Sequence, residues 1–294
     1  MGELTLVGAV TRDRLSSSSW VPGGAVLYGG VSAESLGCAV RVVTAHAEDF
    51  VAPACTAKWS WQHQRCQCTT EFENLELGDL RRQWLWERCG HLSFAEIQNH
   101  DWNPAGWVVL APVFDELELE AALSWVAGLS AGGRCLMPQG WLRTGAVGSR
   151  PFEIAPRRRL VELAALAVHL GVTLDCVCLS EAEVQAEPSA FDRLRGVCRC
   201  LAVTRGAQGA SVYVQDRRLD VGVIDASVCD TTGAGDVFAG ALMATLAQNL
   251  ELEQAVRLAS VAAGLSTEQR GPCPLDRERL FALAESVQLT LRAP

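Results

Sequence analysis

The sequence predicts an α/β protein in which a mostly parallel sheet is covered by helices on both faces. Short apolar runs alternate along the chain with segments whose apolar residues recur at helical spacing, which is typical of repeated strand–helix–strand units. The 294 residues, of which 49% are hydrophobic, are enough to bury one large core. Ligands of such sheets bind beyond the carboxyl ends of the strands, so we expect the functional site there.

The expected elements follow from the length and periodicity of each run. Short apolar runs predict buried strands over residues 4–10, 40–44, 107–111, 134–137, 174–179 and 201–204. Longer runs with helical periodicity predict helices over residues 116–130, 157–170, 236–248 and 252–266. The sequence has no internal repeat and no long linker, so we expect a single domain over residues 1–294.

Composition argues against several classes of function. No apolar run reaches the roughly 18 residues that suggest a membrane-spanning helix. The start Met1-Gly2-Glu3-Leu4 lacks the basic region of a signal peptide, so we expect a cytoplasmic protein whose twelve cysteines are reduced. A net charge of −9 argues against nucleic-acid and anionic-membrane partners.

The single lysine of the chain, Lys58, restricts the ways in which phosphate can be bound. A P-loop requires Gly-Lys followed by Ser or Thr, and that sequence is absent. A P-loop kinase is therefore excluded, and any cation that contacts phosphate is expected to be an arginine or a metal ion.

The most informative motif is the run DTTGAGD at residues 230–236, which directly precedes an apolar helical segment. A glycine loop of this kind presents successive backbone N–H groups to an anion, and the helix N-terminus adds partial positive charge. Asp236 is the one strong base in this anion-attracting loop. A carboxylate that takes a proton from an alcohol beside a phosphate-binding loop suits a phosphotransferase. The alternative is an ordinary strand-to-helix turn.

This motif resembles the C-terminal signature of the ribokinase-like (PfkB) carbohydrate kinase family. The resemblance implies that family's three-layer α/β fold with a small β-sheet lid, and it implies ATP and Mg²⁺ as cofactors. It assigns Asp236 as the catalytic base and the backbone amides of Gly233, Ala234 and Gly235 as the anion hole. In many relatives the aspartate six residues before the base helps to bind a monovalent cation such as K⁺, and Asp230 holds that position.

A second glycine turn, TRGAQG at residues 204–209, lies between two expected strands. A plain hairpin turn is the alternative interpretation. Because the family places its nucleotide-phosphate turn here, the resemblance assigns ATP contacts to Thr204, Gly206 and Gly209, and a phosphate contact to Arg205.

The run SEAE at residues 180–183 follows an expected strand, where the family often shows Asn-x-x-Glu. The family's glutamate organises water around Mg²⁺, so the resemblance assigns that role to Glu183, while Ser180 replaces the asparagine. Few protein ligands are needed, because Mg²⁺ keeps several waters and binds mainly to nucleotide phosphates. A capped helix start is the alternative, and it is compatible with the metal role.

The acceptor site is expected to include residues near the N-terminus. Asp13 follows the first strand, and Gly23 and Gly24 open a helix. In the family the corresponding residues hold the acceptor's hydroxyl groups, which suits carboxylates because they accept hydrogen bonds from vicinal hydroxyls. The alternatives are a turn aspartate and a flexible helix start. Tyr28 stands where the family usually has asparagine, which affects the identity of the acceptor.

A further candidate element is the run QGWLR at residues 139–143, which follows an expected strand. It is similar to a Gln-Gly-x-x-Arg element in the branch of the family that includes inositol kinases. The resemblance places Gln139 and Arg143 at the acceptor pocket or the transferred phosphate. The alternative is a structural role, with Arg143 paired to a surface carboxylate.

Residues 15–21 and 55–72 are placed where ribokinase-like enzymes insert their lid. The second segment alternates with a period of two, which would put Trp59, Trp61 and His63 on one face. We expect acceptor binding to close the lid and exclude water. Because two lids clasp each other in several relatives, we expect a homodimer through Trp59 and Trp61. Packing of both rings on the chain's own core is an equal alternative.

Three C-x-C pairs are the main alternative source of a functional site. Zinc sites favour a C-x₂₋₄-C pair with a second pair at a matching distance, so we expect buried thiols instead of metal ligands. The pairs are Cys66/Cys68, Cys176/Cys178 and Cys198/Cys200.

Together these residues predict an ATP-dependent phosphotransferase that moves the γ-phosphate of ATP to a hydroxyl group of a small sugar or cyclitol. A nucleoside kinase is the alternative within the same class. A catalytically silent kinase fold that acts as a binding subunit is the alternative from another class. Tyr28 and Ser180 support the silent fold, and the intact motif at residues 233–236 argues against it.

Overall fold

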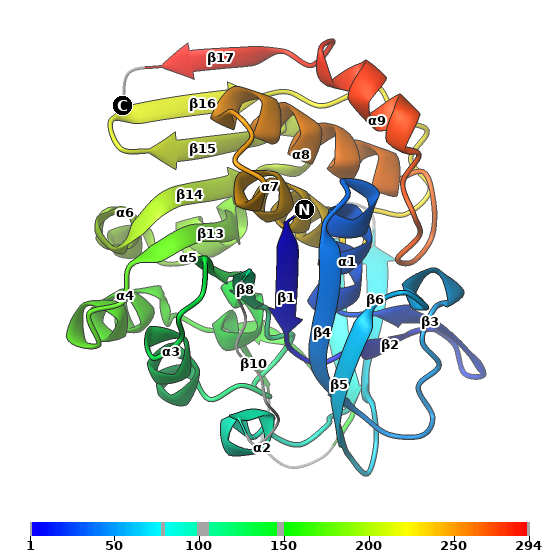
Figure 1. Cartoon of the computed structure of the whole chain (residues 1–294). Coiled ribbons are helices and arrows are strands. Elements are labelled where there is room, and N and C mark those ends of the chain that lie inside the picture. The colour runs from blue at the N-terminus through cyan, green and yellow to red at the C-terminus, as the bar shows by residue number, and fades with distance from the viewer. Residues whose placement is uncertain (1, 78–79, 99–105, 146–149, 293–294) are drawn as a thin grey trace.

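The computed structural model describes residues 2–77, 80–98, 106–145 and 150–292. Within these residues ten strands form a large sheet in the order β17-β16-β15-β14-β13-β9-β8-β1-β4-β5 (Figure 1). The strands from β14 to β5 are parallel to their neighbours, and β15, β16 and β17 are antiparallel. Their bounds are β1 Glu3–Val7, β4 Ala39–His46, β5 Ser60–Arg65, β8 Trp107–Leu110, β9 Gly133–Leu136, β13 Leu174–Ser180, β14 Cys198–Thr204, β15 Ala210–Val214, β16 Arg217–Val221 and β17 Leu289–Arg292.

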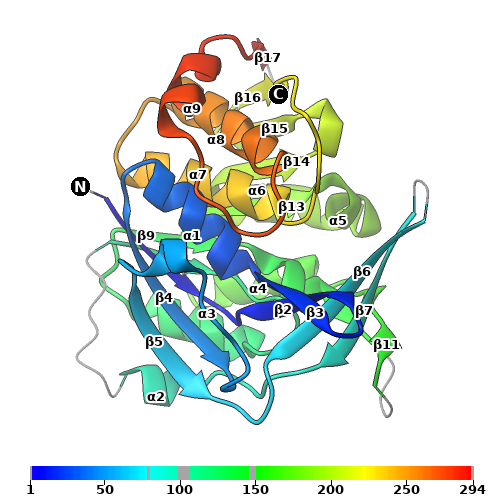
Figure 2. The ribbon, with the colours of Figure 1, turned by 90° about the vertical axis from the view of Figure 1, so that its right-hand side faces the viewer.

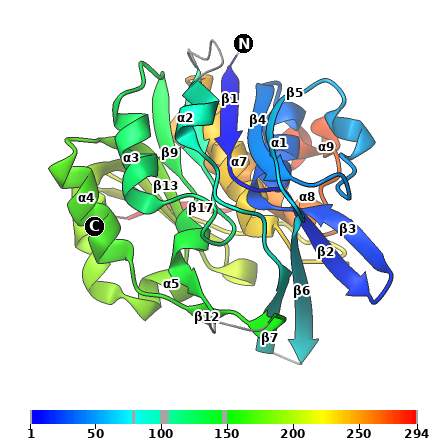
Figure 3. The same ribbon diagram turned by 90° about the horizontal axis from the view of Figure 1, so that it is seen from below.

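Helices cover both faces of this sheet, so the predicted three-layer fold is confirmed. One face carries α1 (Ala25–Ser35), α7 (Ala234–Ala247), α8 (Leu252–Ser266) and α9 (Arg277–Ala284). The other carries α2 (Phe94–Gln98), α3 (Leu119–Ala127), α4 (Leu160–His169) and α6 (Phe191–Val197). Figure 3 shows α2, α3 and α4 from below. Within the described ranges, no helix has the length and hydrophobicity needed to cross a membrane.

The predicted strands and helices are present, with small shifts at their ends. The six predicted strands correspond to β1, β4, β8, β9, β13 and β14, and the four predicted helices to α3, α4, α7 and α8. The remaining short helices are α5 (Glu181–Ala186) and the 3₁₀ turns η1 (Ala54–Thr56), η2 (Pro138–Leu142), η3 (Pro188–Ala190) and η4 (Gly206–Gln208).

Helices α1 and α7 approach each other at glycines. A Cβ atom added to Gly240 would lie 2.4 Å from the Cα atom of Gly29 and 2.6 Å from the hydroxyl of Ser32. No larger residue than glycine fits at this crossing. The contact therefore fixes the start of α1 beside the start of α7, and both starts border the candidate site described below.

The predicted lid is a second, five-stranded sheet with the order β11-β7-β6-β2-β3, which projects from the large sheet in Figure 2. Its strands are β2 (Thr11–Ser16), β3 (Ser19–Gly23), β6 (Thr70–Leu77), β7 (Leu80–Glu87) and β11 (Phe152–Glu153). The predicted lid segment 15–21 lies in the β2–β3 hairpin. A two-stranded sheet of β10 (Arg143–Thr144) and β12 (Ala155–Pro156) lies outside both sheets in the strand order.

The prediction that residues 55–72 form the lid is wrong for most of that segment. Residues 60–65 form β5, which extends the large sheet by pairing in parallel with β4. Only the start of β6, from Thr70 to Phe72, reaches the lid. Alternation of period two identifies a strand but does not identify the sheet that it joins, because pairing depends on tertiary contacts.

Trp59 and Trp61 pack as the alternative interpretation has it, and the homodimer itself stays a prediction. Trp59 is only 7% exposed and lies against α1, where a Cβ atom on Gly30 would be 2.4 Å from its ring. Its indole N–H donates to Glu34 over 2.9 Å, and the Trp61 ring stacks on it with ring centroids 6.0 Å apart. The rings thus pack on the chain's own core, which was the alternative interpretation.

The expectation that all cysteines are reduced is contradicted at one pair. Cys66 and Cys89 form a disulfide with Cα atoms 5.7 Å apart, because the chain returns beside the end of β5 after it leaves β7. Cys176, Cys178 and Cys200 are buried thiols, as predicted. Among the described residues, no group of three or more His, Cys, Asp or Glu side chains is arranged for a metal ion. A cytoplasmic location stays a prediction, since disulfides are typical of oxidising compartments.

We expect Trp59→Ala to lower the free energy of unfolding by about 3–5 kcal/mol, because it removes a buried aromatic ring and leaves a cavity. Urea denaturation followed by circular dichroism measures this loss. Trp20→Ala is the matched control, since Trp20 is 38% exposed, and its loss should stay below about 1 kcal/mol. Equal losses in the two variants would contradict the core position of Trp59.

Candidate active site

A cavity of about 590 Å³ lies between the lid and the carboxyl ends of the parallel strands. Its lining includes three groups of residues, besides others named below. The lid side contributes Phe72, Asn74, Arg82, Gln83 and Glu153; segments at the strand ends contribute Met137, Gln139, Cys178, Ser180 and Thr204; and the start of α7 contributes Thr231, Thr232, Gly233, Gly235 and Asp236.

The start of α7 is open towards this cavity. Gly233 precedes the helix in the left-handed conformation, with φ of 77°, and no side chain caps the helix N-terminus. The amide of Ala234 donates to the carbonyl of Thr231 over 3.3 Å, so it contributes to the turn itself. Because Gly233 and Gly235 line the cavity, the partial positive charge of the helix N-terminus is available to an anion there.

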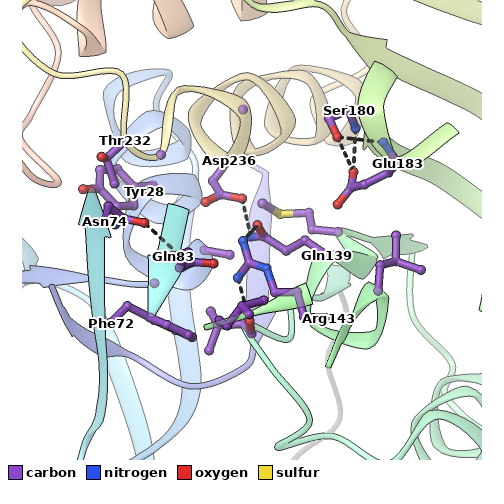
Figure 4. A pocket seen from close by; sticks show the side chains of 18 of the residues that line it. Tyr28, Phe72, Asn74, Gln83, Gln139, Arg143, Ser180, Glu183, Thr232 and Asp236 are labelled. Carbon is purple, nitrogen blue, oxygen red and sulfur yellow. Dashed lines mark hydrogen bonds between the residues drawn. The ribbon is translucent and has the colours of Figure 1, made fainter. Parts of the chain in front are cut away.

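Asp236 is oriented by a hydrogen-bonded series of side chains from the loop after β9 (Figure 4). The Gln139 amide donates to Asp236 Oδ1 over 2.8 Å, and the Arg143 guanidinium donates to Gln139 Oε1 over 3.0 Å. Arg143 also donates to the carbonyl of Val113 over 2.7 Å. The structure thus brings the predicted residues Gln139 and Arg143 to the predicted base.

The predicted acceptor residues come from β2, the end of β3 and the residue before α1. Asp13 accepts from the Thr11 hydroxyl over 2.8 Å, and a Cβ atom on Gly23 would lie 2.3 Å from Asp13 Oδ2. Gly24 has φ of 102° and precedes α1, and both Asp13 and Gly24 line the cavity. Gly23 is therefore a spacer that admits the Asp13 carboxylate.

Tyr28 lines the cavity and also supports the start of α7. Its side chain is 4% exposed, and a Cβ atom on Gly233 would lie 2.4 Å from its ring. This ring occupies the position where the family usually has asparagine. The substitution thus exchanges a small polar side chain for a ring that packs under the glycine loop.

Of the predicted nucleotide residues, only Thr204 lines this cavity. Gly206 and Gly209 form a tight turn with φ of 53° and 82°, and a Cβ atom on Gly209 would lie 1.9 Å from the carbonyl oxygen of Val221. The assignment of Arg205 to a phosphate has no support here, because its guanidinium contacts Ser211 and lies 3.5 Å from Asp220.

Asp220 gathers three guanidinium groups, from Arg205, Arg218 and Arg292. Burial alone would raise the pKa of Asp220, but hydrogen bonds from Ser211 and Arg218 hold this pKa below its ordinary value. The carboxylate is thus ionised at neutral pH and holds Arg205 beside β16. The sequence motif shows that Arg205 follows Thr204, but it does not show which carboxylate lies beside Arg205 in the folded protein.

Glu183 and Ser180 form a complete capping box at the start of α5, and both line the cavity. Glu183 Oε2 accepts from the Ser180 backbone N–H over 2.7 Å and from its hydroxyl over 2.8 Å. The capped helix start is therefore present. It fixes the carboxylate at the cavity wall, which fits the predicted role of holding water around Mg²⁺.

Asp230 fits a monovalent-cation site only in part. Its Oδ1 atom accepts from the Thr232 amide over 2.8 Å, and its Oδ2 atom lies 3.8 Å from the Arg270 guanidinium. A cation bound at this carboxylate would therefore compete with an exposed arginine.

Sequence reasoning missed the residues that the lid turns towards the cavity. They include Phe72 and Asn74 of β6 and Gln83 of β7, and the Gln83 amide donates to Asn74 Oδ1 over 3.0 Å. The available signal was the alternation of TEFENLEL and LRRQWLWE on either side of the dipeptide Gly78-Asp79, which is typical of a hairpin.

Part of the chain is similar in sequence to known carbohydrate kinases. Residues 166–278 match the model of the pfkB family of carbohydrate kinases. The chain is 41% identical over 71 residues to a ribokinase of Lactococcus lactis, a match that covers 24% of each chain. It is 30% identical over 97 residues to an inositol 3-kinase of Arabidopsis thaliana, covering 33% of this chain and 27% of that protein. The matches thus span only about a quarter of these relatives' length.

Solved structures show the same fold over the whole length. A pyrophosphate-dependent kinase in the ribokinase family superposes with a TM-score of 0.73 at 18% identity, covering 95% of this chain and 99% of that one. Phosphofructokinase-2 from Escherichia coli superposes with a TM-score of 0.70 at 14% identity, covering 97% and 99%. These likenesses confirm the predicted fold class.

We expect Gly233→Ala to lower kcat by at least about 100-fold, because the added Cβ would meet the Tyr28 ring and displace the start of α7. Steady-state kinetics at saturating substrates measures the change, and a thermal melt verifies that the variant is folded. Gly196→Ala is the matched control, since nothing lies within 4 Å of its added Cβ. If Gly233→Ala keeps more than about a tenth of wild-type kcat, then activity does not require glycine at position 233.

Proposed function

We propose that this chain, whose residues 166–278 match the pfkB family of carbohydrate kinases, transfers the γ-phosphate of ATP to a hydroxyl group of a small sugar or cyclitol. The observation that carries this proposal is the position of Asp236 in the first turn of α7, beside an uncapped helix N-terminus in one cavity. A base for the acceptor hydroxyl and a site for phosphoryl charge therefore lie next to each other.

In the proposed reaction Asp236 accepts the proton of the acceptor hydroxyl while that oxygen attacks the γ-phosphorus. The bond from the γ-phosphorus to the bridging oxygen breaks, and ADP leaves. Amides at the start of α7, near Gly233 and Gly235, stabilise the charge of the transferred group. The Gln139 amide holds the Asp236 carboxylate in one orientation, which is the part of catalysis that positioning supplies.

Mg²⁺ bound with the nucleotide would neutralise charge on its phosphates, and Glu183 is the residue that fits a water-mediated contact to it. The capping box supports this assignment, because it holds the Glu183 carboxylate at the cavity wall.

A panel assay tests the reaction class directly. Purified protein with Mg²⁺ is supplied with ATP or pyrophosphate as donor, since a pyrophosphate-dependent kinase is among the structural neighbours. Sugars, inositols and nucleosides serve as acceptors. Transfer to a nucleoside alone would favour the nucleoside kinase, and tight polyol binding without any transfer would favour the silent binding subunit.

We expect Asp236→Asn to lower turnover by about 10² to 10⁴-fold, because the amide cannot accept the acceptor's proton. Binding of ATP, measured by isothermal titration calorimetry, should stay within about twofold. Asp216→Asn is the matched control, because it makes the same change in an exposed residue outside the cavity. More than about a tenth of wild-type turnover in Asp236→Asn would disprove the assignment of the base.

We also expect K⁺ to raise activity relative to choline, through a cation bound at Asp230 beside the glycine loop. Because the Arg270 guanidinium lies 3.8 Å from Asp230, Arg270→Gln should lower the K⁺ concentration needed for half-maximal activation. Initial rates in potassium, sodium and choline buffers at constant ionic strength measure both effects. Equal rates in all three buffers would rule out this cation site.

A further inference from the structure

The acceptor side of the cavity presents amides and carboxylates around the base. The Asn74 and Gln83 amides point into it from the lid, the Gln139 amide approaches from the opposite side, and the Asp236 carboxylate lies between them (Figure 4). Asp13 lines the same cavity from β2. Amides both donate and accept hydrogen bonds, whereas carboxylates only accept, so this set matches the hydroxyl groups of a polyol.

The charge around this space is negative. Among the described residues, the ionisable side chains that line the cavity are the carboxylates of Asp13, Glu153, Glu183 and Asp236 and the guanidiniums of Arg82 and Arg143. Carboxylates thus outnumber guanidiniums by four to two. The start of α7 adds partial positive charge on the side of Gly233 and Gly235, where the donor's phosphates are proposed to bind.

Both arginines already have partners. Arg82 makes two hydrogen bonds to Glu153, one of them 2.6 Å long, and these bonds lower the pKa of the Glu153 carboxyl. Arg143 donates to the carbonyl of Val113 and to Gln139. A phosphate or carboxylate on the acceptor would need one of these guanidiniums, and taking it would break the pair with Glu153 or the series that orients Asp236.

Apolar side chains form the rest of this wall. Phe72 is 3% exposed and Val113 is 3% exposed, and both line the cavity beside Leu142 and Ile154. The C–H faces of a sugar or cyclitol ring suit such a surface, and its hydroxyl edges suit the amides.

We propose that the acceptor is an uncharged polyol ring, and that the Asn74–Gln83 pair of the lid reads its hydroxyl groups. This inference rests on the proposed kinase function and narrows it, because it excludes acceptors that already carry a phosphate. A phosphate monoester would bring a charge of about −1.5 to −2 into a cavity with a negative lining. Its desolvation there disfavours binding, because both lining guanidiniums, Arg82 and Arg143, already have partners.

The test compares acceptors in matched pairs that differ only by a phosphate: myo-inositol with myo-inositol 1-phosphate, fructose with fructose 6-phosphate, and ribose with ribose 5-phosphate. We expect kcat/KM of the best neutral acceptor to exceed that of its phosphorylated partner by at least about 100-fold. A phosphorylated acceptor that equals or surpasses its neutral partner in the best pair would overturn the inference and leave the kinase function intact.

Calorimetric binding of the same compounds separates the two proposals when no transfer occurs. Absence of transfer to every acceptor contradicts the proposed function. Binding of a neutral ring in preference to its phosphate ester would still support the uncharged acceptor. Binding of the esters alone, or of neither class, would overturn it.

Variants of the lid pair test the hydroxyl contacts. We expect Asn74→Leu and Gln83→Met to raise the KM of the neutral acceptor by about 5 to 150-fold, because a hydroxyl loses its partner, while the KM of ATP stays unchanged. Gln67→Met is the matched control outside the cavity. An unchanged acceptor KM in both lid variants would disprove their role.

Glu153→Gln tests whether the negative lining and the paired Arg82 disfavour a phosphorylated acceptor. Removing this carboxylate releases Arg82 at the rim, so we expect the preference for the neutral acceptor over its phosphate ester to fall by at least about 10-fold. A merely structural role of the ion pair would change kcat/KM for both acceptors equally, and that result would contradict the charge argument.

Discussion

The close packing of α1 on α7 is the constraint on which the rest of the site depends. Gly29 and Gly240 let the two helices touch at backbone distance, and the Tyr28 ring then fills the space under Gly233. Because α1 begins at the acceptor residues and α7 begins at the base, their relative position sets the distance across which a hydroxyl meets Asp236. Side chains of ordinary size at this crossing would separate the two halves of the cavity.

Local sequence was sufficient to predict the parts of the site that lie on one continuous segment. The run at residues 230–236 predicted a glycine loop and the start of a helix, and Ser180 with Glu183 predicted a capped helix start. The strands of the large sheet could also be predicted, because both of their faces are buried and they therefore appear in the sequence as apolar runs.

Features that depend on contacts between distant segments could not be predicted from local sequence. Alternation in residues 60–65 did not reveal that β5 pairs with β4, and the partner of Arg205 became known only from the fold. The hydrogen bond from Gln139 to Asp236 joins residues 97 positions apart, so neither motif alone contained it. Arginine is the clearest example, because the same residue type can bind a ligand or a neighbouring carboxylate, and only the surrounding structure decides between them.

The Cys66–Cys89 disulfide has a mechanical consequence for the lid. It joins Cys66, in the segment between β5 and β6, to Cys89, in the segment after β7, so it closes a covalent ring that contains this hairpin. The bond thus ties the two ends of the hairpin together next to the end of β5, where the chain leaves the large sheet. Asn74 and Gln83, which the Gln83 amide hydrogen bond joins, are therefore held on one covalently closed hairpin.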